Sequence, residues 1–196
     1  EFTQGCVRIK GMPEKFVSLA DLARQSIGSS GDGPITGRGS VRVAQPAPMF
    51  AVQATDVEVD RETGKVKILS YVAAQDVGLA VNPTLVEGQM QGAITQGIGW
   101  ALMENYIFQK GVMQNATFLD YRLPTAVDLP FMATILVEVG SAAGPYGVRG
   151  VGEPPIVPTL AAIANAIDNA VGIRLKELPI TPEALFWALR EQEKSK

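Results

Sequence analysis

Histidine is absent from the 196 residues, and cysteine occurs once, as Cys6. The lack of histidine excludes a Ser-His-Asp or Cys-His catalytic arrangement within this chain, because histidine is the general base in both. It also argues against a zinc or iron site built from protein ligands, and one cysteine forms neither an iron–sulfur cluster nor an internal disulfide. Acid–base chemistry would therefore come from carboxylates, lysine, tyrosine or a bound cofactor.

Basic blocks and long apolar runs are also missing. The chain has 17 Lys and Arg against 20 Asp and Glu, with a net charge of -3, so we do not expect nucleic-acid binding. We see no membrane-spanning run and no signal peptide, and the single cysteine fits a cytoplasmic protein. The sequence starts at Glu1 without an initiator methionine, and we expect it to be a piece of a longer polypeptide.

Hydrophobic residues make up 46% of the chain, enough for a packed core, and their alternation predicts the strands. Strands are expected at residues 5–10, 50–60, 65–76 and 133–139. The second and third are joined by a turn sequence at residues 61–64 and predict a hairpin. Glycine and proline at residues 11–13 indicate a turn, and residues 28–40 are typical of a connector.

Helical spacing predicts helices at residues 19–27, about 84–103 and 159–171, and another that starts at 181. Capping patterns support the first two, with Ser18 and Thr84 as the expected N-caps. Gly172 is expected to end the third helix. Strands and helices alternate without a regular βαβ rhythm, which favours an α+β fold over a doubly wound sheet.

Residues 144–155 (GPYGVRGVGEPP) place one carboxylate, Glu153, between glycines and two prolines. Glycine allows a backbone to approach a ligand closely, and proline restrains the residue before it. One interpretation of this segment is therefore that it holds the Glu153 carboxylate in a fixed position. On the other reading, the segment is an ordinary glycine-rich turn with a solvated glutamate.

Glycines also interrupt the helix predicted at about 84–103. Each glycine costs about 1 kcal/mol relative to alanine, so four in one helix need a reason. Close packing on another element is one reason, and close approach of a bulky ligand is the other. The glutamine amides of this helix can both donate and accept hydrogen bonds, which suits a heterocyclic ligand or simply a polar helix surface. These residues are Gly88, Gly92, Gly97, Gly99, Gln89 and Gln96.

Many short motifs occur in a specific order. They are VEVDRETGKV at residues 57–66, QDVG at 75–78, NP at 82–83, VEGQMQG at 86–92, QGIGWAL at 96–102, DY at 120–121, DLP at 128–130, GVRGVGEPP at 147–155, AAIANAI at 161–167 and LPITP at 178–182. This succession resembles the C-terminal part of the molybdenum-binding subunit of the xanthine dehydrogenase/aldehyde oxidase family, the molybdenum hydroxylases. The resemblance runs over residues 45–190, and residues 1–45 fit it less distinctively.

The resemblance implies roles for three residues. Glu153, in the Gly-Val-Gly-Glu-Pro-Pro motif, matches the catalytic base, and we expect burial to tune it for that role. Gln89 matches the glutamine beside the molybdopterin, and Gly152 would let the backbone approach the cofactor. No protein ligand to the metal is expected, because the pterin dithiolene holds the molybdenum. Gln75 departs from the usual His-Asp-Val-Gly motif, but that position is not the base and we expect activity to tolerate it.

The implied reaction is the oxidation of an electron-poor carbon with oxygen derived from water. Residues 1–196 would form a single C-terminal fragment of the molybdopterin-binding domain, with residues 46–196 as its most characteristic part. Its partners would be the upstream part of the same subunit, subunits with iron–sulfur clusters and FAD, and a small-molecule substrate. The substrate stays open among purines, aldehydes, N-heteroaromatic compounds, carbon monoxide and aromatic acyl-CoA thioesters. The isolated fragment is expected to be inactive.

Two alternatives remain at this point. The chain could be a catalytically silent scaffold or assembly module with the same fold. It could also be a glutamate-based hydrolase unrelated to molybdenum, in which Asp120 or Asp128 supplies a second carboxylate beside Glu153. A paired geometry of carboxylates would favour the hydrolase; otherwise the two aspartates are expected to cap or brace loops.

Overall fold

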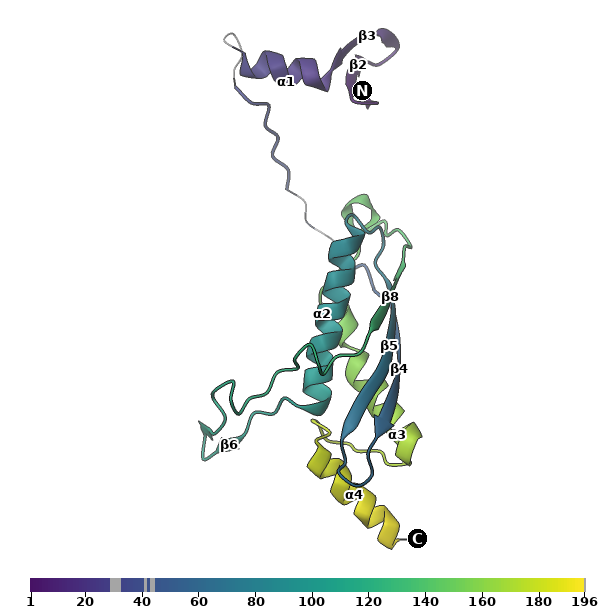
Figure 1. Cartoon of the computed structure of the whole chain (residues 1–196). Coiled ribbons are helices and arrows are strands. Elements are labelled where there is room, and N and C mark those ends of the chain that lie inside the picture. The colour runs from purple at the N-terminus through teal and green to yellow at the C-terminus, as the bar shows by residue number, and fades with distance from the viewer. Residues whose placement is uncertain (29–32, 41, 43–44, 196) are drawn as a thin grey trace. The chain divides into compact units, whose positions relative to one another are not determined.

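The computed structural model describes residues 1–28, 33–40, 42 and 45–195, and the chain forms two compact units, Glu1–Arg42 and Val43–Lys196 (Figure 1). The predicted connector falls partly on residues 29–32, which lie outside the described residues. Each unit is described by itself, and a single domain over residues 1–196 stays a prediction.

The first unit is a small antiparallel sheet followed by a helix. Its strands are β1 (Phe2–Thr3), β2 (Cys6–Ile9) and β3 (Met12–Ser18), in that order, and the helix is α1 (Leu19–Ile27). The strand predicted at residues 5–10 is confirmed, but the prediction of a turn at residues 11–13 missed the start of β3. Pro13 is tolerated there because β3 lies at the edge of the sheet, where a proline does not remove a ladder hydrogen bond. Ser18 caps α1 as predicted, with its Oγ accepting from the Asp21 amide at 3.1 Å.

The second unit is built on a three-stranded sheet of β4 (Ala51–Val59), β5 (Val66–Asp76) and β8 (Met132–Val137). β4 and β5 form the predicted antiparallel hairpin, and β8 adds to β5 in parallel. A parallel neighbour needs a long crossover connection. Helix α2 (Pro83–Leu102) provides it, followed by the short hairpin of β6 (Phe108–Gln109) and β7 (Val112–Met113). The observed mixture of helices and strands is the α+β fold that the sequence predicts.

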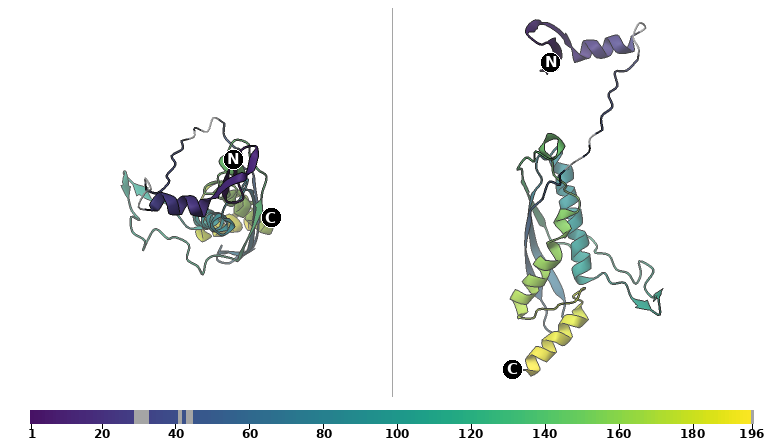
Figure 2. Two further views of the ribbon diagram at one scale, coloured as in Figure 1. Left: turned by 90° about the horizontal axis from the view of Figure 1, so that it is seen from above. Right: turned by 180° about the vertical axis from the view of Figure 1, so that it is seen from behind.

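Helices α2 and α3 (Thr159–Val171) cover one face of this sheet, as Figures 1 and 2 show from opposite sides. The core lies between the helices and the sheet and is made of side chains that are almost fully buried. They include Tyr71, Ala73, Val77, Met90, Ile94, Ile98, Ile163, Ile167, Leu185 and Leu189. The last two belong to α4 (Pro182–Lys194), which packs against the turn between β4 and β5.

The helix ends follow local chemistry, with one correction. Thr84 is not the N-cap of α2; Asn82 is, and its Oδ1 accepts from the Leu85 amide at 3.2 Å. Pro83 explains the shift, because proline favours the first helical position and keeps the residue before it extended. The predicted end of α3 at Gly172 is confirmed, with φ of 68°. Within the part of the chain that the structure describes, no helix combines the length and hydrophobicity needed to cross a membrane.

Candidate functional site

The glycine-rich segment that carries Glu153 is bound to the end of β5 by backbone contacts. Gly78, just beyond β5, forms an isolated antiparallel bridge with Val148. The Leu79 amide donates to the Gly147 carbonyl at 3.1 Å, and the Arg149 amide donates to the Val77 carbonyl at 3.1 Å. Gly78 has φ of +67°, and a Cβ at this position would lie 2.2 Å from the Gly147 oxygen. The two chain segments therefore cross at a distance that only glycine permits.

An ion pair reinforces this crossing. Arg149 Nε lies 3.1 Å from Asp76 Oδ2, and the two side chains are only 12% and 11% exposed. Asp76 Oδ1 also accepts from the Gly78 amide at 3.0 Å, so the carboxylate orients both segments. A pair that is this well enclosed is strongly destabilised when one partner is removed, because the other charge stays buried.

Gln75, where the sequence departs from the family motif, lies under the same segment. Its side chain is 1% exposed, and its Nε2 reaches the Gly150 carbonyl at 3.5 Å. Its Oε1 is buried without a hydrogen-bond partner among the described residues. Gln75 therefore contacts the loop that carries Glu153, although Gln75 itself is not placed to act as a base.

On the other side of Glu153, the side chains of Gln53 and Thr159 contact the Pro155 carbonyl, and Tyr71 in turn holds Gln53. Gln53 of β4 donates from Nε2 to this oxygen at 2.6 Å, and Thr159 Oγ1, at the start of α3, lies 2.9 Å from it. Gln53 Oε1 accepts from the Tyr71 hydroxyl at 2.6 Å and lies 2.9 Å from Thr159 Oγ1. We call Gln53, Tyr71 and Thr159 the Pro155 anchor. Sequence reasoning missed it, because its members are spread over strands and a helix.

The phenol of the Pro155 anchor gives a pH-dependent prediction. Burial raises the pKa of Tyr71 from 10.0 to about 12, and the polar side chain of Thr159 opposes this rise. The unfolded chain therefore loses the phenol proton near pH 10, while the folded chain keeps it. Below that pH the contribution of Tyr71 to stability is complete, and it falls by about 1.4 kcal/mol per pH unit as the pH rises towards about 12.

Urea unfolding between about pH 9 and pH 12, for the parent chain and Tyr71→Phe, measures this loss. The other titrating groups are shared, so the difference in free energy of unfolding between the two proteins should shift by about 2–3 kcal/mol over the range. Parallel pH profiles would show that the phenol is not protected from ionisation.

Gln89, Gly152 and Glu153 come together on one surface. A Cβ built on Gly152 would lie 3.2 Å from Gln89 Nε2, so the glycine segment meets the side chain of α2 closely. Both Gln89 and Glu153 are exposed in this chain. The burial that the resemblance implies for Glu153 concerns the enzyme with its cofactor and stays a prediction, since in this chain Glu153 is exposed. Gln89 and Gly152 are 63 positions apart in the sequence but adjacent in the structure. This adjacency agrees with the roles that the resemblance implies.

The four glycines of α2 fall into two pairs with different surroundings. A Cβ on Gly97 would lie 2.6 Å from the Cβ of Thr159, and one on Gly99 would lie 1.9 Å from Glu104 Oε1. Those two are packing glycines. Around Gly88 and Gly92, in contrast, there is no atom within 4 Å of a built Cβ. Packing within the described chain does not explain them, and they flank Gln89 on the exposed side of the helix.

The carboxylates required by the hydrolase alternative lie elsewhere. Asp128 braces a turn, where it accepts from the Thr125 amide at 2.8 Å and from its hydroxyl at 2.7 Å, and these bonds lower the pKa of the Asp128 carboxyl. Lys65, whose charge also acts on Asp128, precedes β5 at the end opposite to Gly78. Asp120 lies in the turn before Tyr121, which binds Glu104 beyond the C-terminal end of α2. The paired geometry that would favour a hydrolase is not formed.

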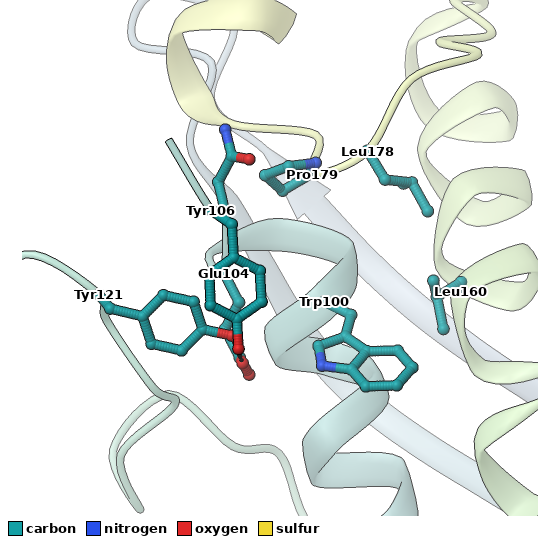
Figure 3. A pocket seen from close by; sticks show the side chains of 8 residues that line it. Trp100, Glu104, Tyr106, Tyr121, Leu160, Leu178 and Pro179 are labelled. Carbon is teal, nitrogen blue, oxygen red and sulfur yellow. Dashed lines mark hydrogen bonds between the residues drawn. The ribbon is translucent and has the colours of Figure 1, made fainter. Parts of the chain in front are cut away.

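A hollow of about 330 Å³ lies at that C-terminal end of α2 (Figure 3). Its rim carries the rings of Tyr106 and Tyr121, stacked with centroids 4.9 Å apart. The Tyr121 hydroxyl donates to Glu104 Oε2 at 2.5 Å, and this bond raises the pKa of Tyr121. Trp100 and Leu160 line the inner wall. Sequence reasoning did not find this hollow. Trp100, which lines the hollow, lies eleven residues after Gln89 on α2, or roughly 16 Å along the helix axis, so the hollow is a separate feature.

These observations define an α+β unit that presents a glutamine, a glycine and a glutamate together on an exposed rim. A family model described as a molybdopterin cofactor-binding domain matches residues 1–130. The chain belongs to this family, whose members bind the molybdopterin cofactor. The match begins at residue 1, so the N-terminal residues belong to the family pattern as well.

The chain is also similar to parts of longer proteins of known type. It is 37% identical over 183 residues to the putative xanthine dehydrogenase molybdenum-binding subunit of Escherichia coli K12. The aligned residues make up 92% of this chain and 24% of that protein. It resembles the crystal structure of a Cu,Mo-CO dehydrogenase with a TM-score of 0.81 and 28% identity, over 98% of this chain and 25% of that one. The chain also resembles the crystal structure of quinoline 2-oxidoreductase from Pseudomonas putida 86, with a TM-score of 0.80 and 28% identity. That match covers 97% of this chain and 26% of the other. The chain thus spans about a quarter of the length of these relatives.

Proposed function

We propose that this chain forms the C-terminal part of a molybdopterin-binding large subunit and supplies the catalytic base, Glu153, of a molybdenum hydroxylase. The observation that carries the proposal is the convergence of Gln89, Gly152 and Glu153 on one rim, in a chain of the molybdopterin cofactor-binding family. The remaining parts of the cofactor site would come from the upstream part of the same subunit.

The residues present fit such a cofactor. Gln89 has an exposed amide that can donate to and accept from a pterin, and it is positioned against Gly152. Gly88 and Gly92 leave open space beside it, which a bulky group can approach closely. Gln89 would hold the pterin, and Gly152 would admit the cofactor to within contact of the backbone next to Glu153.

Glu153 would accept a proton during the reaction. Oxidation of a carbon–hydrogen bond with oxygen from water releases two protons and two electrons for each substrate, so a base beside the reacting atoms accelerates it. The molybdenum cofactor, when bound, supplies the two-electron redox chemistry. Iron–sulfur clusters and FAD on other subunits would then carry the electrons away. The exposure of Glu153 in this chain means that the upstream part and the cofactor would have to cover it.

Replacing Gln89 by alanine in the assembled enzyme is expected to weaken cofactor binding about 3- to 10-fold, because one polar contact to the pterin is lost. Molybdenum and pterin content, measured after co-expression with the upstream part and dialysis, checks this. The stability of the chain itself should hold or rise slightly, because Gln89 is exposed and alanine is the better helix former.

Gln91→Ala is the matched control, since Gln91 is an exposed glutamine two residues further along the same helix. It should leave the cofactor content unchanged. Equal losses in both variants, or none in either, would remove the support for a cofactor beside Gln89 and favour the silent scaffold.

A further inference from the structure

We infer that the Pro155 anchor (Gln53, Tyr71 and Thr159) is a positioning device for Glu153. This rests on the proposed function of Glu153 and extends it to three buried or half-buried side chains that do not touch the cofactor surface. The anchor holds the backbone two residues after the carboxylate, so it acts on the direction of the Glu153 side chain without contacting it.

The geometry restrains the carboxylate from both ends. Before Glu153, the chain is fixed at Arg149 by its ion pair with Asp76. After it, the Pro155 oxygen is held by Gln53 and lies within hydrogen-bond distance of Thr159. Pro154 and Pro155 fix φ in between and transmit the restraint, since they leave few torsions free. The Ile156 amide then donates to the Glu153 carbonyl at 3.1 Å and closes a single turn.

The chemistry of the anchor sets the orientation of the Gln53 amide. The Tyr71 hydroxyl donates to Oε1, which leaves the NH2 group directed at the Pro155 oxygen. A rotated amide would place an acceptor against that carbonyl. Tyr71 and Thr159 are almost completely buried, so no water replaces a lost donor easily. The Gln53 amide therefore has one satisfied orientation, and in that orientation its donor holds the Pro155 oxygen.

Two nearly isosteric substitutions test the inference in the assembled enzyme. Thr159→Val removes the hydroxyl, and Gln53→Glu replaces the donor by an oxygen that repels the Pro155 carbonyl. Each is expected to lower kcat about 10- to 100-fold with molybdenum content and KM unchanged, because small misplacements of a catalytic group have effects of this size. For Gln53→Glu, the loss relative to the parent enzyme at the same pH should shrink as the pH falls towards about 4, near the ordinary pKa of glutamate, where the protonated acid can donate again. Thr159→Ser, which keeps the hydroxyl, should restore most of kcat.

A readout independent of activity uses the chain itself. Amide hydrogen exchange at Ile156, which closes the turn after Glu153, should accelerate at least about 10-fold in Thr159→Val. Thr55→Val is the control: Thr55 lies two residues from Gln53 on β4, and its hydroxyl donates to the Ser70 carbonyl at 2.8 Å, away from this segment. It should change neither exchange at Ile156 nor kcat.

The outcomes separate the two proposals. If Glu153→Gln abolishes turnover but both anchor variants keep normal kcat and normal exchange at Ile156, the anchor has no positioning role and the proposed function stands. If Glu153→Gln is fully active, the proposed function fails whatever the anchor does. Accelerated exchange with unchanged kcat would also overturn the inference, because the restraint would exist without serving Glu153.

Discussion

Glu153→Gln in the assembled enzyme is expected to lose turnover by several orders of magnitude while it keeps molybdenum and pterin. Glutamine has nearly the shape of glutamate but cannot accept the proton that the proposed reaction releases. General base catalysis alone contributes about 10²- to 10⁴-fold, and the loss should reach at least that size. The measurement is dye reduction by substrate, together with metal and pterin analysis of the same preparation.

The control for this variant is Glu87→Gln, which makes the same change of charge on the exposed surface of α2, two residues from Gln89. It should have near-normal turnover. A near-normal rate for Glu153→Gln would end the assignment of Glu153 as base. A loss of cofactor in Glu153→Gln would instead show that the residue helps to hold the cofactor, and kcat would then have to be compared per bound molybdenum.

Gly78→Ala is expected to destabilise the chain by about 3–5 kcal/mol. The methyl group would lie 2.2 Å from the Gly147 oxygen and 2.8 Å from the Arg149 amide nitrogen, both backbone atoms that cannot move aside cheaply. The left-handed conformation, at φ of +67°, adds its own cost for any residue with a Cβ. Because stability is commonly about 5–15 kcal/mol in total, much of the variant could be unfolded at 37 °C.

Gly111→Ala separates the two causes. Gly111, in the β6–β7 hairpin, has φ of +80° but no atom within 4 Å of a built Cβ. Gly111→Ala should lower the free energy of unfolding by only about 1–2 kcal/mol, because only the left-handed conformation is unfavourable for alanine there. Urea unfolding of both variants gives the comparison. Equal destabilisation would show that the crossing between β5 and the glycine segment relaxes without penalty, and that this segment is held less firmly than the contacts indicate.

Much of the second unit was predictable because its signals are local. Alternation in residues 50–76 found the β4–β5 hairpin, and the glycine at position 172 marked the end of α3, as observed. The errors also have local causes. The capping pattern at residues 84–87 predicts Thr84 as the cap, but Pro83 places the helix start after Asn82. In the first unit, Pro13 is typical of a turn but lies in an edge strand.

The candidate site divides in the same way. Glu153, Gln89 and Gly152 were identified through motifs in their neighbourhoods, and the structure places Gly152 against Gln89. Their roles remain proposals. The sequence left both a positioned and a solvated Glu153 open, because burial depends on which elements surround a loop. The Pro155 anchor left no trace in the sequence, since Gln53 and Thr159 lie 106 residues apart and each has an ordinary local pattern.

Sequence by itself determined the composition limits, the strands and helices of the second unit, and the motifs that resemble the molybdenum hydroxylases. Those properties follow from side-chain periodicity, caps and turn residues, which act over a few positions. Only the tertiary structure decided which glycines of α2 are required for packing and how the segment of Glu153 is held between Asp76 and the Pro155 anchor. Such contacts join residues that are distant along the chain, and they exist only once the sheet and helices have packed together.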